Sequence, residues 1–277
     1  MSRIRSTPHA HTTYVRGGKN TAEEMVLAAI GAGFRSVGLS EHGGQEIDPA
    51  YGLSAADAPA YIAEVRDLRK KYAGRIRVHL GVERDLFSTA RREDYDYVIG
   101  STHYLMDGET FYGVDWNLED LLACREKVFG GDGAAMARAY FRQLADYAAD
   151  FRPDILGHFD LIRLRNGGGA LYDPEDRHVL AAQHEALEAV RQSGALLELN
   201  TGAMARGHLD TPYPEQRLLA YWKKLGGGVI VSSDAHSAAN IDFAFERMPE
   251  RLRAAGFETF WELGAEGEPL FVERALD

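Results

Sequence analysis

The chain has 277 residues, of which 45% are hydrophobic and 26% are charged, a composition typical of a globular protein with a substantial core. Its formal net charge of -11 argues against general nucleic-acid binding, which needs a basic surface, and no apolar run is long enough to cross a bilayer. The single cysteine, Cys124, excludes an internal disulfide framework. We expect one domain, residues 1–277, in a cytoplasmic protein, because the first motif begins at Pro8 and leaves no room for a signal peptide.

Predicted helices and strands alternate along most of the chain. Thr21 and Glu24 have the spacing of a capping box, and the helix that they begin ends at Gly33. A first strand is expected at residues 4–7, and further strands at residues 36–40, 77–83, 95–100, 154–158, 195–200 and 229–233. Further helices are expected at residues 55–72, 118–128, 134–149, 175–192, 214–225 and 241–254.

This alternation of strands and helices predicts an α/β fold with a parallel sheet. With about seven strands, the expected architecture is a distorted TIM-like (β/α)7 barrel. A doubly wound open sheet is the alternative, but such sheets bind ligands at one switch point. Here nearly every predicted strand ends in a polar residue, which favours the barrel and a site at the C-terminal ends of its strands.

Metal-binding residue types recur at these strand ends. Of the ten histidines, those that lie where a hydrophobic segment gives way to a loop are His9, His11, His42, His103, His158 and His236. Glu83 closes a further strand in the same way, and Asp234 lies at the strand end that also carries His236. A single His-X-His is more often chance than a metal site, but recurrence along the chain is not demanded by packing. Imidazole and carboxylate together suit zinc, manganese or iron, so we expect a polynuclear hydrolytic site.

The order of these motifs resembles the polymerase and histidinol phosphatase (PHP) family of metal-dependent phosphoesterases. The similarity runs through nearly the whole chain, and local context resembles the histidinol-phosphatase branch at residues 20–25, 34–42, 97–104, 157–163 and 197–202. The resemblance implies a barrel that holds two or three divalent metal ions (Zn, Mn or Fe) and hydrolyses a small-molecule phosphate monoester.

The resemblance also implies a division of the ligands. One metal would be held by His9, His11, Glu83 and Asp234. Glu83 would bridge to a second, held by His103 and His158, and His42 with His236 would hold a third. Two cations sharing a bridging carboxylate can generate hydroxide near neutral pH and neutralise the phosphoryl oxygens.

One departure from the family pattern lies shortly after the His-X-His motif. Family members usually carry an acidic residue or histidine in the turn before the first helix, whereas this chain has Arg16 and Gly17. Neither can coordinate a cation, so the third metal is expected to bind weakly or to be absent. Glu41 is a candidate for helping to hold this third metal, or for supporting a metal ligand without binding the metal itself.

Phosphate recognition beyond the metals calls for arginine, whose fork matches two phosphate oxygens. Arg163 and Arg206 stand in the segments where the resembling phosphatases place such residues, so the resemblance implies that they bind the substrate. Their nearest rivals are Arg165 and His208. Other residues considered for the site are Asp160 and Glu198, which could orient ligand histidines or meet a cationic substrate, and the pocket candidates Tyr104 and Tyr112.

The resemblance implies hydrolysis of L-histidinol phosphate to L-histidinol and phosphate, with no covalent phosphoenzyme. Glu83, Asp234 and His236 are the predicted catalytic residues, of which Asp234 or His236 would manage the leaving-group proton. A phosphoesterase for nucleotides or oligonucleotide ends, and a metal-binding module that has lost catalysis, remain alternatives. No membrane partner and no long nucleic acid are expected, because the chain is acidic.

Overall fold

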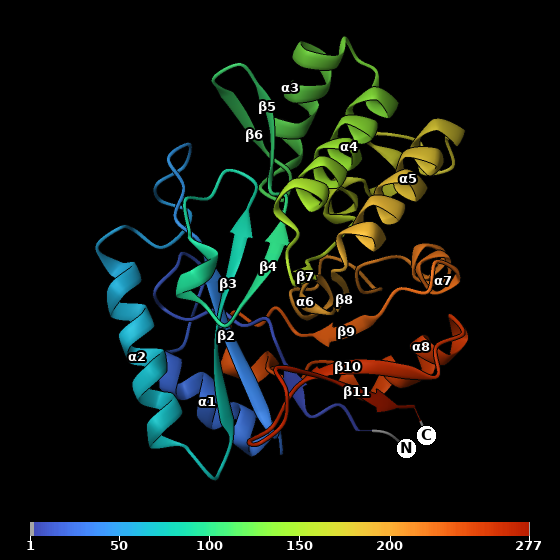
Figure 1. The fold of residues 1–277 in the computed structure, drawn as a ribbon. Coiled ribbons are helices and arrows are strands. Elements are labelled where there is room, and N and C mark those ends of the chain that lie inside the picture. Colours follow the sequence, from blue (N-terminus) through green and yellow to red (C-terminus); the bar gives the residue numbers. More distant parts are fainter. Residues whose placement is uncertain (1–2, 277) are drawn as a thin grey trace.

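The computed structural model describes residues 3–276, which form a mixed α/β fold around one large sheet. The sheet runs in the order β1-β2-β3-β4-β7-β8-β9-β10-β11 (Figure 1). Its strands are β1 (Ser6–Thr7), β2 (Ser36–His42), β3 (Arg77–Asp85), β4 (Tyr97–Ser101), β7 (Ile155–Leu156), β8 (Leu196–Asn200), β9 (Val229–Ser232), β10 (Thr259–Leu263) and β11 (Phe271–Ala275). Neighbouring strands from β1 to β10 pair in parallel, and β11 returns antiparallel to β10.

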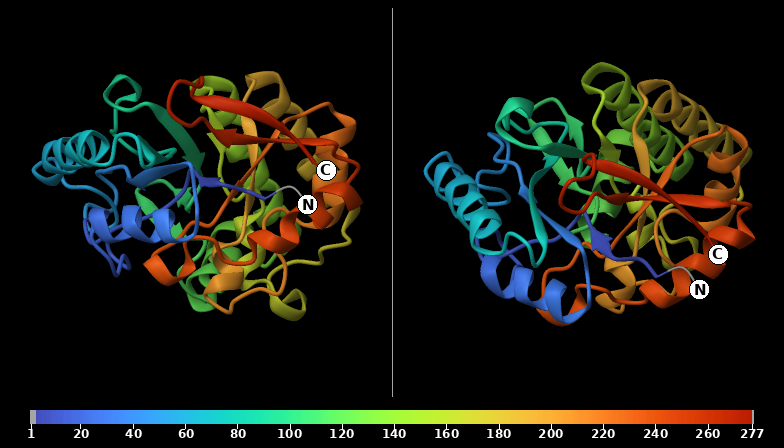
Figure 2. Two further views of the ribbon diagram at one scale, coloured as in Figure 1. Left: turned by 90° about the horizontal axis from the view of Figure 1, so that it is seen from below. Right: turned by 60° about the horizontal axis from the view of Figure 1, so that its bottom comes forward.

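Helices cover the outside of this sheet, as the views in Figure 2 show. They are α1 (Ala22–Gly31), α2 (Asp57–Lys71), α3 (Leu118–Phe129), α4 (Gly133–Phe151), α5 (Arg177–Ser193), α6 (Gly202–Ala205), α7 (Gln216–Lys224) and α8 (Met248–Ala254). The predicted capping box at the start of α1 is confirmed, since the Glu24 N–H donates to Thr21 Oγ1 and the Thr21 N–H donates to the Glu24 carboxylate. None of the described helices has the length and apolar character that a membrane span requires.

The structure departs from the predicted elements in three places. A short antiparallel hairpin, β5 (Tyr104–Asp107) and β6 (Thr110–Gly113), precedes α3, and the β10–β11 hairpin ends the chain. Neither was predicted. The expected helix at residues 241–254 is helical in the α form only from Met248, after a 3₁₀ turn at Phe245–Arg247.

The two ends of the parallel sheet approach one another, although the described residues show no continuous ladder between β1 and β9. Ser6 Oγ accepts from the Leu263 N–H at 3.1 Å, and an isolated parallel bridge joins Ala10 to Ala235. The ladder of β1 stops at Pro8, which has no N–H to donate. The expected (β/α)7 barrel is therefore seen in its coarser form, as a curled and largely parallel sheet with helices outside it.

A tyrosine forms the floor beneath the C-terminal edge of the sheet. Tyr97 is buried in β4, and its hydroxyl donates to the main-chain oxygen of Pro8. Glycines on the two preceding strands make room for its ring, because an added Cβ would lie 1.9 Å from the Tyr97 hydroxyl at Gly38 and 2.4 Å from the ring at Gly81. This packing fixes the backbone immediately before His9.

His79 lies inside the fold, where its ring makes a structural hydrogen bond. The ring is 2% exposed, and because a carbonyl can only accept, Nε2 donates to the Gly264 oxygen at 2.9 Å. Burial lowers the pKa of His79 from 6.5 to about 4. The sequence-based interpretation of this histidine as structural agrees with that position.

This buried imidazole should make stability depend on pH. Between pH about 6.5 and 4 the unfolded chain binds a proton that the folded chain does not. The free energy of unfolding therefore decreases as the pH is lowered through this range, by up to about 3 kcal/mol. We expect His79→Gln, which keeps a donor for Gly264, to flatten that part of the profile in denaturant titrations. Wild-type and variant profiles that stay parallel would contradict this assignment.

Candidate metal centre

The C-terminal edge of the sheet brings together every predicted metal ligand. Each comes from the end of a parallel strand or from the loop directly after it, where side chains of neighbouring strands converge. The ligands come from the segment after β1 (His9, His11), β2 (His42), β3 (Glu83), the segment after β4 (His103), the segment after β7 (His158) and the segment after β9 (Asp234, His236). Seven of these side chains are buried to 91% or more, and that of His236 is 22% exposed.

Glu83 lies at the centre of this arrangement, with its two carboxylate oxygens facing different imidazoles. Oε2 is 3.1 Å from His9 Nε2 and 2.7 Å from His42 Nδ1. Oε1 is 3.2 Å from His103 Nε2 and 2.8 Å from His158 Nε2, and it also accepts from Ser101 Oγ at 2.8 Å. A carboxylate arranged in this way can bridge two cations.

His9, His11 and Asp234 form one cluster beside Oε2 of Glu83. Their ligand atoms lie within 4.8 Å of one another, and the Nε2 atoms of the two histidines are 3.1 Å apart. Asp234 has a left-handed backbone, with φ of 45°, directly after β9. Its Oδ1 is 3.2 Å from His11 Nε2, so the tight turn aims this carboxylate at the histidine pair.

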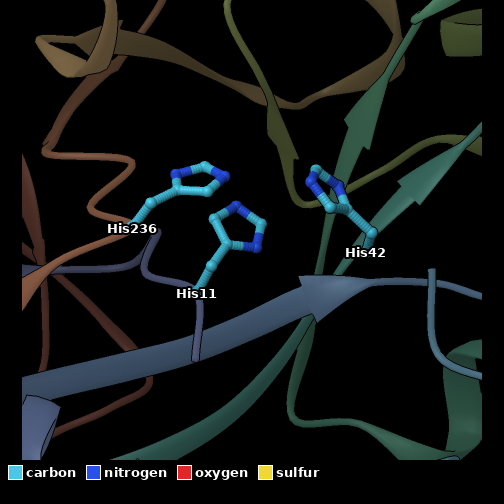
Figure 3. Close-up of side chains that lie close together, drawn as sticks. All are labelled: His11, His42 and His236. Carbon is cyan, nitrogen blue, oxygen red and sulfur yellow. The ribbon is translucent and has the colours of Figure 1, made fainter. Parts of the chain in front are cut away.

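A second cluster joins His11 to His42 and His236, with ligand atoms again within 4.8 Å (Figure 3). The His11 ring lies between the other two, with centroids 4.3 Å from each. The sequence pattern assigned only His42 and His236 to a third metal, so the structure adds His11 as a neighbour. Gly17 lies at this position too, since an added Cβ would be 3.4 Å from the His236 ring.

Carboxylates outside the cluster orient several ligand histidines. Glu198 accepts from His9 Nδ1 at 2.6 Å and from the His158 N–H at 2.7 Å. Asp85 accepts from the His103 N–H at 2.7 Å and faces its Nδ1 at 3.2 Å. Glu198 was one of the considered residues, whereas Asp85 was missed, although it follows Glu83 by two residues on the same face of β3.

Glu41 supports the loop that carries the first histidines. Its Oε1 accepts from the Thr12 N–H at 2.7 Å and from the Thr12 hydroxyl, while Oε2 is 3.5 Å from His11 Nδ1. Partners of this kind fix the tautomer and orientation of a ligating histidine.

The charges in this buried cluster are strongly coupled. Burial alone lowers the pKa of His9, but Glu198, Glu83 and Asp234 reverse the effect and raise that pKa well above its ordinary value. Burial also raises the pKa of Glu83, but the surrounding imidazoles bring it well below its usual range. Glu83 is therefore an anion that faces several nitrogen ligands.

The donor set fits a divalent cation. Glu83 Oε2 and His42 Nδ1 are buried and 2.7 Å apart, yet neither has a hydrogen-bond partner. The facing Nε2 atoms of His9 and His11 can form a hydrogen bond with each other only if one of the two nitrogens carries a proton and the other does not. Imidazole nitrogens and carboxylate oxygens that converge in this way are the ligand types that zinc, manganese and iron take.

A cavity of about 230 Å³ opens onto this cluster. Its walls include Arg165, Arg206 and His208, together with Arg16 and Gly17 at the site of the missing family ligand. Arg206 donates to Asp234 through Nη2–Oδ2 and Nη1–O contacts of 3.2 Å each. Of the two predicted phosphate-binding arginines, Arg206 is the one that reaches the cavity.

The structure places Arg163 away from the cavity, so its predicted phosphate contact stays a prediction. Its guanidinium donates to Asp160 Oδ2 at 3.1 Å, to Thr211 Oγ1 at 3.0 Å and to the Pro212 oxygen at 2.8 Å, and it does not line the cavity. Arg163 and Arg165 lie in one 3₁₀ turn, Leu161–Arg165, and a separation of two residues turns them to different sides. Asp160 therefore pairs with Arg163. In the described part of the chain, Asp160 makes no hydrogen bond or ion pair with a ligand histidine.

The aromatic side chain at the cavity is Tyr51. Neither Tyr104 nor Tyr112 lines it, and the buried Tyr104 hydroxyl instead donates to Asp48 at 3.0 Å. The Tyr51 ring lies 4.4 Å from the His42 ring and 5.3 Å from the His103 ring. It belongs to the loop between β2 and α2, which carries no sequence signal that would have singled it out.

Gly202 should be essential for placing Asp234. An added Cβ at Gly202 would lie 2.7 Å from Asp234 Oδ2 and 2.9 Å from its Cβ, distances that side chains do not tolerate. We expect Gly202→Ala to displace this carboxylate and to lower both bound metal and kcat/KM by about tenfold or more, as loss of ligand orientation does. Gly31→Ala, where an added Cβ meets nothing within 4 Å, is the matched control. Normal metal content in Gly202→Ala would contradict the argument.

Comparison with known proteins agrees with this geometry. The family model for the PHP domain matches residues 8–202, which include six of the eight converging side chains, His9 to His158. The chain belongs to the PHP domain family. Asp234 and His236 follow the matched segment, and the structure joins them to the PHP residues at the same edge of the sheet.

Relatives of this PHP chain carry phosphatase names. A Deinococcus radiodurans protein named "Probable histidinol-phosphatase" is 29% identical over 91% of this chain and 94% of its own length. The Bacillus subtilis histidinol-phosphatase is 23% identical over 88% of this chain and 97% of its own length. The histidinol phosphate phosphatase of Lactococcus lactis, solved with zinc, L-histidinol and phosphate, has a TM-score of 0.72 and 19% identity, and it covers 94% of this chain and 97% of that chain. This structural likeness establishes a shared fold.

Proposed function

We propose that this chain is a metal-dependent histidinol-phosphatase, which hydrolyses L-histidinol phosphate to L-histidinol and phosphate. The observation that carries the proposal is the position of Glu83, whose two oxygens face separate groups of imidazoles at the floor of a small cavity. The names of full-length relatives, which match across about nine-tenths of the chain, support the choice of substrate.

Two or three divalent ions would be held by the residues that converge here. His9, His11, Glu83 and Asp234 would hold one, Glu83 would bridge it to a second beside His103 and His158, and His11, His42 and His236 would surround the third position. When bound, such ions supply Lewis acidity, which activates water and neutralises phosphoryl oxygens.

The rest of the chemistry belongs to side chains of the cavity. Arg206 spans from the Asp234 carboxylate to the cavity, where its remaining donors can meet phosphate oxygens. The leaving alcohol needs a proton, and we assign its delivery to the pair Asp234 and His236 on the same wall. Glu198, Asp85 and Glu41 keep the ligand rings in place, so that the site is preorganised.

The same proposal includes the finer features of the fold. We infer a single barrel-like domain over residues 1–277, supported by the Ala10–Ala235 bridge and by the approach of β1 to β10. The expected substrate is a small phosphate monoester, because a cavity of about 230 Å³ cannot enclose a long chain.

A comparison of substrates tests this proposal. We expect kcat/KM for L-histidinol phosphate to exceed the values for a nucleoside monophosphate and for p-nitrophenyl phosphate by at least about tenfold. Preferential hydrolysis of the nucleotide would contradict the proposed substrate and favour a nucleotide phosphoesterase on the same metal centre. Failure to hydrolyse any ester with zinc, manganese or iron supplied would contradict the proposed chemistry.

A further inference from the structure

One acidic residue of the cavity takes no part in the metal cluster. Glu83, Asp115 and Asp234 are the carboxylates that line it among the described residues. Glu83 faces ligand imidazoles, and Asp234 contacts both imidazoles and Arg206. The side chain of Asp115 shows no hydrogen bond and no ion pair in the described part of the chain, and its Oδ1 is buried without a partner.

A buried carboxylate oxygen without a donor is costly, so this one calls for an explanation. Asp115 belongs to none of the ligand clusters found in the described chain. It lies in the loop between β6 and α3, outside the strand ends that carry the ligands. A role as a further metal ligand is therefore not supported by its position, and because Asp115 lines the cavity, a group on the substrate can supply the missing donor.

The backbone around Asp115 is held on both sides. The preceding residue, Val114, is buried and donates its N–H to the main-chain oxygen of His103 at 2.8 Å. The main-chain oxygen of Asp115 accepts from Arg165 Nε at 3.1 Å and Nη2 at 2.6 Å. Arg165 thus binds the main-chain oxygen of Asp115 and not its carboxylate, and this contact holds the loop that places the carboxylate at the cavity.

Tyr51 faces the same space from the loop between β2 and α2. The Tyr51 ring contacts the His42 and His103 rings. The cavity therefore carries Arg206 beside the metal ligands and, on the loop before α3, the carboxylate of Asp115.

This separation of charge matches an ester that carries a cation close to its phosphate. The amine of L-histidinol phosphate is protonated near neutral pH, and an ammonium group has three donors and no acceptor. We propose that Asp115 is the specificity-determining residue that binds the protonated amine of the substrate, an inference that rests on the function proposed above. The phosphate then lies toward Arg206 and the metal ligands, and esters without a cation leave the Asp115 charge unpaired.

The test compares two esters on metal-loaded enzyme. A hydrogen bond to a charged group contributes about 1.5–3 kcal/mol, so Asp115→Asn should lower the ratio of kcat/KM for L-histidinol phosphate to kcat/KM for p-nitrophenyl phosphate by about 10- to 100-fold. Most of the change should appear in KM for the histidinol ester. The inhibition constant of the product L-histidinol should also rise in the variant, and by a larger factor than the inhibition constant of inorganic phosphate.

The control is Asp107→Asn, an exposed acidic residue on β5 of the neighbouring hairpin, which should leave the ratio unchanged. Equal losses on both esters in Asp115→Asn, or an unchanged ratio, would overturn the role of Asp115 while leaving the proposed function intact. Wild-type enzyme without any preference for L-histidinol phosphate would overturn the proposed function, and the assignment of Asp115 with it.

Discussion

Glu83→Gln is expected to lower kcat/KM for L-histidinol phosphate by about a thousandfold or more, the largest effect of any single substitution considered for this chain. The amide keeps the size of the side chain but removes the charge that faces His9 and His42 on one oxygen and His103 and His158 on the other. Loss of a bridge between two cations removes several kcal/mol of charge stabilisation, and about 4 kcal/mol corresponds to three orders of magnitude. Metal content, measured on the purified variant, should fall together with activity.

Two comparison variants make this result specific. Glu109→Gln changes an exposed glutamate in the β5–β6 turn and should leave both metal content and kcat/KM unchanged. Arg163→Ala should cost much less activity than Glu83→Gln, because Arg163 holds the Thr211–Pro212 segment and does not line the cavity. Comparable losses in Glu83→Gln and Arg163→Ala, at equal metal content, would contradict this division of roles.

Glu198→Gln should lower metal affinity or activity by about 10- to 100-fold, the range typical of residues that orient metal ligands. Glu198 is fully buried and accepts from His9 Nδ1, the His158 N–H, Asn200 Nδ2 and Ser232 Oγ. A glutamine must direct its NH2 group at one of these donors, so at least one ligand histidine loses its support.

The readout for Glu198→Gln separates orientation from catalysis. Because Glu198 acts through His9 and His158, excess metal should restore much of kcat in the variant. Glu185→Gln, at an exposed position on α5, is the matched control. Wild-type metal affinity in Glu198→Gln would show that the buried carboxylate does not orient the ligands.

The ligands could be predicted from sequence because parallel strands place their C-terminal ends at one edge. Once His42, Glu83 and His103 follow successive strands of one sheet, their convergence requires no knowledge of side-chain rotation. The same reasoning could have found Asp85, which shares the face of Glu83 on β3, but the sequence does not show which carboxylates lie outside the cluster.

Residues outside the strands could not be placed in this way. Arg163 and Arg165 are two residues apart, and only the turn that they share decides which one reaches the cavity. Tyr51 and Asp115 come from loops whose paths depend on tertiary contacts, such as the bond from Val114 to His103. The β10–β11 hairpin was missed because the strand and helix alternation of the rest of the chain does not extend to it.

The most direct test of the central claim is phosphate release from L-histidinol phosphate before and after removal of metal. Protein stripped with a chelator and freed of it should be inactive, and separate titration with Zn²⁺, Mn²⁺ and Fe²⁺ should restore activity with at least one ion as bound metal reaches two or more per chain. Full activity in the stripped protein, with metal content measured as zero, would contradict a metal centre built around Glu83.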